Sequence, residues 1–462
     1  MRVSQKCWEA GSLSHKENSS PISRARRDRC SQLWLLHDAN PNTDTPRKQL
    51  AAKLHFALNP SAPSRGEDPI REGLRFCFEV SLLKFRIPIL DPDLPTFVDF
   101  FAGSGLVTEG AKRFCAPVWA NDICPKKAAI YTANHGNDHF HLGSIELVGG
   151  TSIPPGDIVW ASFPCQDLSL AGKMGGLAGS RSGLFWEWIR VLDEMPKKPK
   201  VLALENVVGL LSGNGGDDFR FVYRALRDRS YKVGPMLLDA RMWVPQSRPR
   251  VFIVAAQDQI DTSTFEDNGP NWLHPEPVLK ASAILNDVIF WSMRQPNKCS
   301  KTLTDIIDWD AAVFENDRAN ALFSLVAPRH QELLDRLPAN RRAVFPGYRR
   351  TRKGKQVLEL RFDDRSGCLR TAEGGSSCQF LLLHNAGKWA ARLITPREAA
   401  RLMGAPETYK LSSSYNESYN AMGDAVVAPV VAYLFEHLLT PLASQRAVAS
   451  GRKITSLQKS LL

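Results

Sequence analysis

The sequence lacks several features that would mark a membrane or secreted protein. No apolar run reaches the roughly 18 residues that a membrane-spanning helix needs, because the best candidate, 425–440, is interrupted by Pro429, Glu436 and His437. The first residues contain no continuous apolar stretch of the secretory type. The nine cysteines include no C-x-x-C pair, which argues against a disulfide framework or a zinc site. We therefore expect a soluble intracellular protein with no membrane and no metal.

The composition is that of a globular chain with a basic balance. Of 462 residues, 43% are hydrophobic and 23% are charged, which suits two or three domains at roughly 150 residues each. The 59 Lys and Arg exceed the 48 Asp and Glu by 11. A positive excess of this size suits an anionic partner such as nucleic acid, although a basic balance is often only a solvated surface.

The texture of the sequence changes near residue 91. Residues 1–90 mix Ser, Pro and Arg without a clear period and are interpreted as a flexible basic extension. From Thr96 onward, short apolar strands alternate with helical stretches, which predicts a doubly wound, mostly parallel α/β sheet. The expected strands are 97–101, 117–121, 157–163, 201–204 and 251–256, and the expected helices between them are 185–194 and 219–227.

The rhythm breaks after about residue 257. Residues 258–390 show little period and are expected to form a smaller, irregular module, whose densest feature is the stretch 341–355 with seven basic residues and no acidic ones. The pattern predicts a helix over 395–403, with Pro396 in its first turn and Gly404 at its end. A second, apolar helix is expected within 419–439, after a glycine turn, and 441–462 is a polar tail.

A glycine-bearing turn follows the first predicted strand, in Asp99-Phe-Phe-Ala-Gly-Ser-Gly105. Glycines let the backbone approach a ligand, and the start of the next helix offers free N–H groups. Asp122 follows the second strand, where a carboxylate could hold ribose hydroxyls. Because the pattern is not G-x-G-x-x-G, a nucleoside fits better than a dinucleotide, and a tight turn with a surface Asp is an equally good explanation.

Three further groups lie at predicted strand ends. Cys165 follows the third strand in Phe-Pro-Cys-Gln, at the edge of the sheet where ligands bind in α/β folds, and it could equally be a buried hydrophobe. Glu205 ends the fourth strand and could act as a general acid, or be an ordinary surface Glu. Arg248 and Arg250 precede the fifth strand, and alternate residues of an extended segment share a face; solvated charges at a strand edge are the alternative.

Together, these groups resemble the ordered motifs of the cytosine-5 DNA methyltransferase family. The matching stretches are DFFAGSG, AND, FPCQDLS, GSRSGLF, LENVVGL, VPQSRPR, RLITPREAARLMGAP and MGDAVVAPVV, spread over roughly 96–440. The resemblance is to prokaryotic restriction–modification enzymes. It implies methyl transfer from S-adenosylmethionine to C5 of a cytosine flipped out of a specific duplex DNA site, catalysed by a monomer that lies with the nucleoid in the cytoplasm and accompanies a cognate restriction endonuclease where one exists.

The resemblance also implies a role for each matched residue. Cys165 is the nucleophile, Glu205 serves N3 of the base, and Arg248 and Arg250 steady the base. The donor site comprises Phe101, Ala102, Gly103, Ser104, Gly105, Asp122, Ile123, Pro164, Asp424 and Ala425. The DNA site comprises Gln166, Ser169, Asn206, Gln246, Arg370, Thr371, Gly374 and Gly375, with Asn206 and Gln246 supporting loop geometry. The glycine-rich stretch 172–179 matches a loop that closes on the base, and 258–390 matches the target-recognition module, with 391–440 returning to the catalytic domain.

Three positions depart from the family pattern, and two other functions compete with the main one. Ser144 stands where an acidic residue is usual, Ile123 replaces a large aromatic residue, and Asp424 replaces the usual Asn. These changes bear on donor binding more than on the reaction, because the nucleophile, acid and arginine motifs are intact. The alternatives are an RNA (tRNA) cytosine-5 methyltransferase and a non-catalytic DNA-binding relative.

Overall fold

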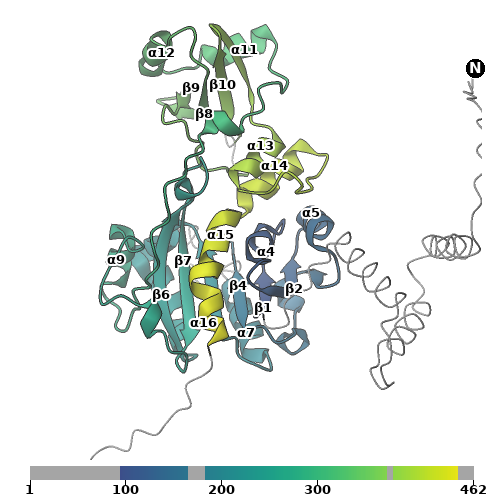
Figure 1. The fold of residues 1–462 in the computed structure, drawn as a ribbon, viewed down its shortest axis with the longest axis vertical. Coiled ribbons are helices and arrows are strands. Elements are labelled where there is room, and N and C mark those ends of the chain that lie inside the picture. The colour runs from purple at the N-terminus through teal and green to yellow at the C-terminus, as the bar shows by residue number, and fades with distance from the viewer. Residues whose placement is uncertain (1–93, 165–182, 372–377, 446–462) are drawn as a thin grey trace, which may run out of the picture. The chain divides into compact units, whose positions relative to one another are not determined.

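The computed structural model describes residues 94–164, 183–371 and 378–445, all within one unit of the chain, Ile89–Leu462. The expected extension 1–90, the loop 172–179 and most of the tail 441–462 lie outside the described residues. The larger of two sheets has seven strands in the order β3-β2-β1-β4-β5-β7-β6 (Figure 1). Its strands are β1 Thr96–Phe100, β2 Ala116–Asp122, β3 Phe140–Leu142, β4 Ile158–Ala161, β5 Val201–Asn206, β6 Tyr231–Asp239 and β7 Pro249–Gln257.

The first five strands of this sheet run parallel, and β7 is antiparallel to both β5 and β6. Parallel strands need crossover helices, and these cover both faces of the sheet. The helices of this part are α4 Leu106–Ala111, α5 Pro125–His135, α7 Gly183–Glu194, α8 Asp217–Arg227 and α9 Glu276–Ser282. The predicted doubly wound, mostly parallel fold is confirmed.

Two apolar cores lie on opposite faces of the large sheet. One contains Leu106 of α4, Trp291 and the buried side of the C-terminal helices. The other contains Trp188 of α7, Phe219 of α8 and residues of α9. The C-terminal segment consists of α13 Pro396–Leu402, α14 Tyr415–Asp424, α15 Ala428–Leu434, a π-helical turn Phe435–Leu439 and α16 Thr440–Ser444. The expected helix at 395–403 is thus present, capped by Thr395 and Glu398.

The segment Tyr415–Ser444 is, among the described residues, one helical stretch long and apolar enough to cross a membrane by length and composition, with a mean hydropathy of 1.6. In the structure 61% of its most apolar window is buried, and Val431, Leu434 and Phe435 pack in the first core. The chain between α14 and α15 is extended at Ala425 and Val427. The apolar residues of Tyr415–Ser444 therefore pack in the protein core.

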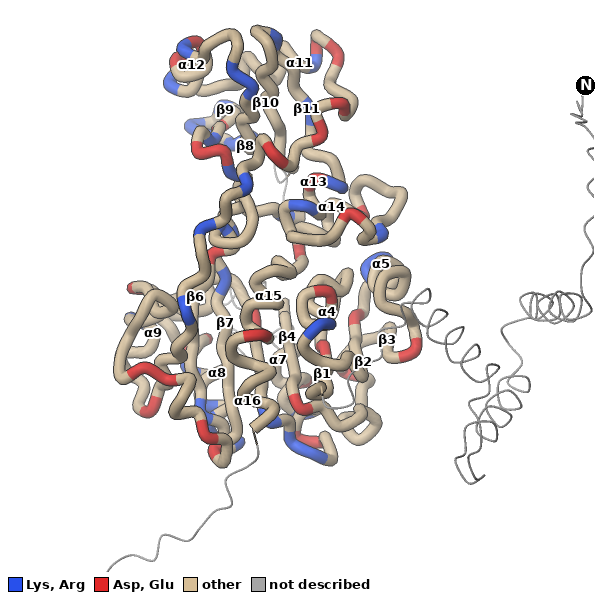
Figure 2. Tube along the Cα trace, in the orientation of Figure 1, with Lys and Arg blue, Asp and Glu red and all other residues tan. Residues whose placement is uncertain are grey.

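The smaller sheet is antiparallel, with the strand order β11-β10-β8-β9. Its strands are β8 Ala343–Arg352, β9 Lys355–Leu360, β10 Phe380–Asn385 and β11 Lys388–Leu393, and helices α10 Leu303–Ile306, α11 Asn316–Phe323 and α12 Pro328–Asp335 belong to the same part of the chain. A third core joins α11 and α12 to this sheet. The basic stretch 341–355 forms β8 and its turn into β9, where Lys and Arg gather (Figure 2). A regular sheet therefore exists where the sequence shows little period.

Candidate active site

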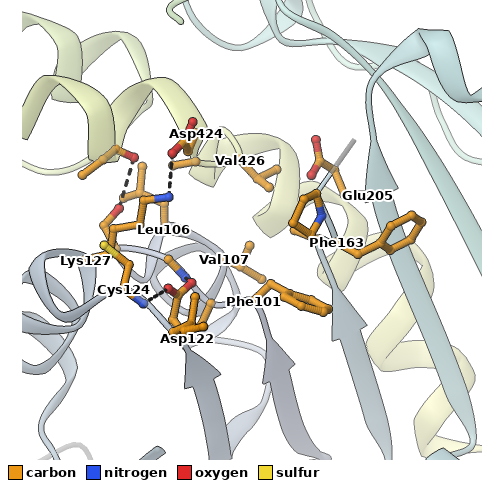
Figure 3. Close-up of a pocket in the computed structure, with 18 of the residues that line it drawn as sticks. Phe101, Leu106, Val107, Asp122, Cys124, Lys127, Phe163, Glu205, Asp424 and Val426 are labelled. Carbon is orange, nitrogen blue, oxygen red and sulfur yellow. Dashed lines mark hydrogen bonds and ion pairs between the residues drawn. The ribbon is translucent and has the colours of Figure 1, made fainter. Parts of the chain in front are cut away.

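A cavity of about 420 Å³ lies at the carboxyl ends of β1, β2, β4 and β5 and against the end of α14 (Figure 3). Ligands of open α/β sheets bind at this edge. Thirteen residues expected in the site line the cavity: Phe101, Ala102, Gly103, Ser104, Asp122, Ile123, Pro164, Glu205, Asn206, Arg248, Arg250, Asp424 and Ala425. The structure therefore brings together motifs that are more than 300 residues apart in the sequence.

The turn after β1 forms one wall of the cavity. Phe101, Gly103 and Gly105 all have positive φ angles, of 59°, 57° and 89°, a backbone conformation that favours glycine. A Cβ on Gly103 would meet nothing within 4 Å, whereas a Cβ on Gly105 would lie 2.6 Å from His135 Cδ2. The first glycine thus leaves open space beside the cavity, and the second allows α5 to pack closely against the start of α4.

Asp122 holds this turn in place. Its Oδ2 accepts a hydrogen bond from Gly103 N at 2.8 Å, and its Oδ1 accepts one from Cys124 N at 2.8 Å. The carboxylate faces the cavity (Figure 3), and each carboxylate oxygen can accept more than one hydrogen bond. Asp122 is therefore placed to fix the glycine turn and still accept hydroxyl groups of a ligand.

An ion pair that the sequence motifs do not predict forms another wall of the cavity. Lys127 Nζ of α5 lies 2.5 Å from Asp424 Oδ2 of α14, and both residues line the cavity (Figure 3). Burial lowers the pKa of the Lys127 ammonium, but its interactions with Asp424 outweigh this and raise the pKa overall. Lys127 thus neutralises the negative charge that Asp424 introduces in place of the usual Asn. The sequence gives no signal for it beyond a lysine in the first turn of a helix.

The acid and arginine motifs meet on the opposite side of the cavity. Arg250 Nε lies 2.9 Å from Glu205 Oε1, and the two side chains are 16% and 10% exposed. Arg250 is delivered to this edge because β7 runs against β5, which places the start of β7 beside the end of β5. The expected proximity of these two residues is thus present as a partly buried, charge-assisted pair.

Arg248 is 2% exposed and is bonded to the backbone of other motifs. Its Nη1 donates to Leu369 O at 2.9 Å, and its Nη2 donates to Gly423 O and Ala425 O at 2.8 Å. Its Nε has no hydrogen-bond partner. Arg248 therefore joins the start of β7, the segment before β10 and the end of α14, while still lining the cavity.

Cys368 is a thiol close to Arg248 and Arg250. Arg248 Nη1 donates to its Sγ at 3.3 Å, and Arg250 Nη2 lies 3.9 Å from it. Burial would raise the pKa of this thiol, but the charges of Arg248 and Arg250 lower it below its ordinary value. Cys368 was not predicted as a site residue, although its position two residues before Arg370 is a usable signal in the sequence.

Two amide side chains expected at the DNA site support the backbone instead of facing solvent. Asn206 Nδ2 donates to Phe163 O at 3.2 Å, which ties the end of β5 to the residues just before Cys165. Gln246 has no exposed surface. Its Nε2 donates to Leu402 O, and its Oε1 accepts from Leu369 N at 3.0 Å. Both contacts suit the expected supporting role.

The remaining expected residues fall at the margin of the cavity or beyond the described part. Arg370 is exposed, and its carbonyl carbon would lie 2.8 Å from a Cβ on Gly423, so the segment of Arg370 and Thr371 passes directly over the end of α14. Cys165, Gln166, Ser169, Gly374 and Gly375 lie outside the described residues. Within the described ranges, no group of three or more His, Cys, Asp or Glu side chains could hold a metal ion.

Comparison with known protein families identifies the family that has these motifs. A model of the C-5 cytosine-specific DNA methylase family matches residues 95–440, which includes every motif described above. The chain belongs to this family. It is therefore a DNA (cytosine-5-)-methyltransferase, and the family implies S-adenosylmethionine as the methyl donor.

Bacterial relatives of this methylase align along most of their length. The Type II methyltransferase M.HhaI of Haemophilus parahaemolyticus is 27% identical over 346 residues, which cover 73% of this chain and 92% of that protein. M.NlaX of Neisseria lactamica is 27% identical over 361 residues, covering 77% and 99%. Among solved structures, the methyltransferase EhMeth of Entamoeba histolytica shares the fold, with a TM-score of 0.52 at 15% identity over 74% of this methylase and 97% of that chain.

Proposed function

We propose that the cavity is the reaction chamber of the methylase, with the donor along the glycine turn and the target cytosine beside Glu205 and Arg250. The observation that carries this proposal is the ion pair of Glu205 and Arg250 at 2.9 Å in the same cavity as Asp122 and the open face of Gly103. A volume of about 420 Å³ falls in the range of small-molecule sites. When bound, S-adenosylmethionine supplies an electrophilic methyl group on a sulfonium.

The donor fits the residues that line its side of the cavity. Asp122 is placed to accept ribose hydroxyls, and Phe101 and Ile123 offer apolar surface to an adenine ring. Ile123 is 67% exposed, so it is free to pack against a ligand. The backbone of Phe101–Gly105 and the region of Asp424 and Ala425 enclose the space between these groups and the acid side.

Cys165 carries out the covalent step in this proposal. Its thiolate adds to C6 of the cytosine while Glu205 protonates or hydrogen-bonds N3, so that the electron pair accumulates at C5. C5 then takes the methyl group, and loss of the C5 proton to a base allows the sulfur to leave and restores the ring. Pro164, the residue before Cys165, lines the cavity, and the bond from Asn206 to Phe163 O supports this strand end.

The arginines have separate tasks. Arg250 holds the Glu205 carboxyl group in position through their ion pair. Arg248 fixes the backbone around the cavity through its three carbonyl partners and leaves Nε directed to no protein group. Recognition of the DNA sequence falls to 258–390, chiefly through the smaller sheet with Arg370 and Thr371, while Gln166, Ser169, Gly374 and Gly375 complete the DNA contacts.

The cellular setting of the methylase forms part of the same proposal. The relatives are named Type II methyltransferases, which supports a restriction–modification role with a cognate endonuclease. One chain carries both sheets and the whole set of described site residues, which supports a monomer. A DNA substrate also supports a place beside the nucleoid in the cytoplasm.

The test uses duplex DNA with 5-fluorocytosine, which cannot lose a proton from C5 after methylation and so traps the adduct. The full-length protein with donor should give a protein–DNA band that survives SDS, and label from the donor should enter DNA and not tRNA. Cys165→Ala should abolish both adduct and turnover while duplex binding persists.

Cys368→Ala is the matched control, because this thiol lies beside Arg248 and Arg250. It should retain the adduct. An adduct that persists in Cys165→Ala and disappears in Cys368→Ala would show that the nucleophile has been assigned to the wrong cysteine. Label found only in tRNA would overturn the DNA substrate.

A further inference from the structure

A second cavity, of about 680 Å³, lies behind the arginine segment that walls the active site. Arg248 and Arg250 line the first cavity, whereas Ser247 and Pro249 line the second. Alternate residues of an extended segment point to opposite sides, so one stretch of backbone separates the two cavities. The rest of the second cavity is formed by the end of β6 and the turn after it at 241–242, by residues of the 272–298 segment and by residues 361–365.

The lining of this second cavity carries a net positive charge. It contains four basic residues, Arg241, Lys298, Arg361 and Arg365, and two acidic ones, Asp239 and Asp363, which gives 4 − 2 = +2. The two acids are already engaged. Arg361 pairs with Asp363 at 2.5 Å, and Asp239 accepts from Arg248 N at 2.8 Å and lies 3.4 Å from Arg241 Nε.

Lys298 and Arg365 are the two cations left over. Within the described ranges, neither has a carboxylate within ion-pair distance, and Arg365 Nη1 donates only to the carbonyl of Arg241, at 3.2 Å. Lys298 is exposed and Arg365 is half-buried. Two uncompensated cations that line the same cavity suit an anion with several oxygens, and a guanidinium can contact two oxygens of a phosphate at once.

We propose that this cavity binds backbone phosphates of the DNA strand next to the target base, with Lys298 and Arg365 as the contacting groups. The proposal rests on the proposed methyl transfer to a flipped base in duplex DNA. The base would enter on one side of the segment 246–250, and the strand carrying it would lie across the same sheet edge. Extruding a base costs a few kcal/mol, and phosphate contacts beside the extrusion point offset this cost without reading sequence.

The site differs from the basic hairpin of β8 and β9. The hairpin belongs to the smaller sheet, whereas the second cavity is shared between the end of β6 and residues 361–365, which follow β9. Contacts here would hold the strand at a fixed distance from Glu205, whatever sequence the recognition module selects. The two groups of basic residues should therefore behave differently when they are removed.

The experiment compares duplex binding by the full-length protein and by Lys298→Ala/Arg365→Ala, measured by fluorescence anisotropy over a range of salt concentrations. Each phosphate contact contributes about 0.9 to the slope of log K against log salt, so the slope should become shallower by about 1 to 2. At about 0.1 M salt this corresponds to a loss of affinity of roughly 8- to 60-fold. The loss should be the same for cognate and unrelated duplexes.

The matched control is Lys197→Ala/Lys198→Ala. These exposed lysines precede β5 and lie at the opposite edge of the sheet, and their loss changes the net charge by the same amount. The control should keep the wild-type salt slope, and all variants should keep the wild-type Tm and donor affinity. An unchanged slope in Lys298→Ala/Arg365→Ala, or the same fall in the control, would overturn the phosphate site.

The outcome is separable from that of the proposed function. A wild-type protein that binds duplex DNA but transfers no methyl group would refute the reaction, and the comparison of slopes would still decide the phosphate site. A wild-type protein that binds no duplex at all would overturn both. A loss of affinity confined to the cognate duplex would assign the two cations to base recognition and refute the backbone role.

Discussion

The ion pair of Arg392 and Glu398 should be the most sensitive electrostatic element of the described fold. The two side chains are 2% and 0% exposed, and they pair through both oxygens, at 2.7 and 2.6 Å. Glu398 also accepts from Thr395 N and Asp308 N, each at 2.8 Å. Thus β11, α13 and the loop at 308 depend on one carboxylate.

Glu398→Gln keeps the size of the side chain but leaves the guanidinium buried without a counter-charge. Breaking a buried pair in this way costs about 3–5 kcal/mol. At about 1 to 2 °C per kcal/mol, extrapolated from smaller domains, the Tm should fall by roughly 3 to 10 °C. Differential scanning fluorimetry and urea unfolding would measure this change.

The control is Glu407→Gln, the same substitution in an exposed pair. Arg401 Nε lies 2.7 Å from Glu407 Oε1, with side chains 28% and 62% exposed, so its loss should cost under about 1 kcal/mol. Arg392→Met/Glu398→Leu, which removes both charges, should recover most of the stability lost in Glu398→Gln. Equal Tm values for Glu398→Gln and Glu407→Gln would refute the reasoning.

Two more predictions concern the donor side and pH. Lys127→Met leaves the charge of Asp424 uncompensated in the cavity. It should weaken S-adenosylmethionine binding about fivefold, the equivalent of about 1 kcal/mol for a partly exposed pair. Calorimetry should show that Lys127→Met/Asp424→Asn restores the affinity, and a double variant that binds as weakly as the single one would refute the compensation. Burial lowers the pKa of both His135 and His274 to about 4, so below pH 6.5 the unfolded chain binds the extra protons and stability should fall as the pH drops toward 4. Thermal melts should show a smaller fall in His135→Gln/His274→Gln, and an identical pH profile would contradict this origin.

The fold could be predicted from the sequence wherever apolar runs are bounded by turn residues. β6 was missed because Gly234 and Pro235 interrupt its pattern. Its position at the edge of the sheet tolerates a proline. The glycine is explained by tertiary packing, since a Cβ there would lie 2.4 Å from Nε1 of Trp291. No local rule reveals a glycine that a tryptophan 57 residues away requires.

The site could be predicted where its motifs lie at the ends of strands, because these ends meet at one edge of the sheet. The approach of Glu205 and Arg250 follows from two adjacent strands that run in opposite directions, because the end of β5 then meets the start of β7. The partners of Arg248 do not, because its acceptors lie at residues 369, 423 and 425 and are backbone carbonyls, which carry no sequence signature. The role of Lys127 was not predicted because its partner Asp424 is 297 residues away.

The hydrogen bonds of Gln246 and Arg248 bear on the grafting of one enzyme's sequence preference onto another. Both side chains form hydrogen bonds with the main chain of Leu369, which lies between β9 and β10 of the smaller sheet. A chimera that imports that sheet must provide a carbonyl and an amide at the same place, or Arg248 and Gln246 lose these hydrogen bonds. By contrast, Lys353 and Gly354 in the turn between β8 and β9 are exposed, although the positive φ angles of this turn, 48° and 77°, still favour glycine.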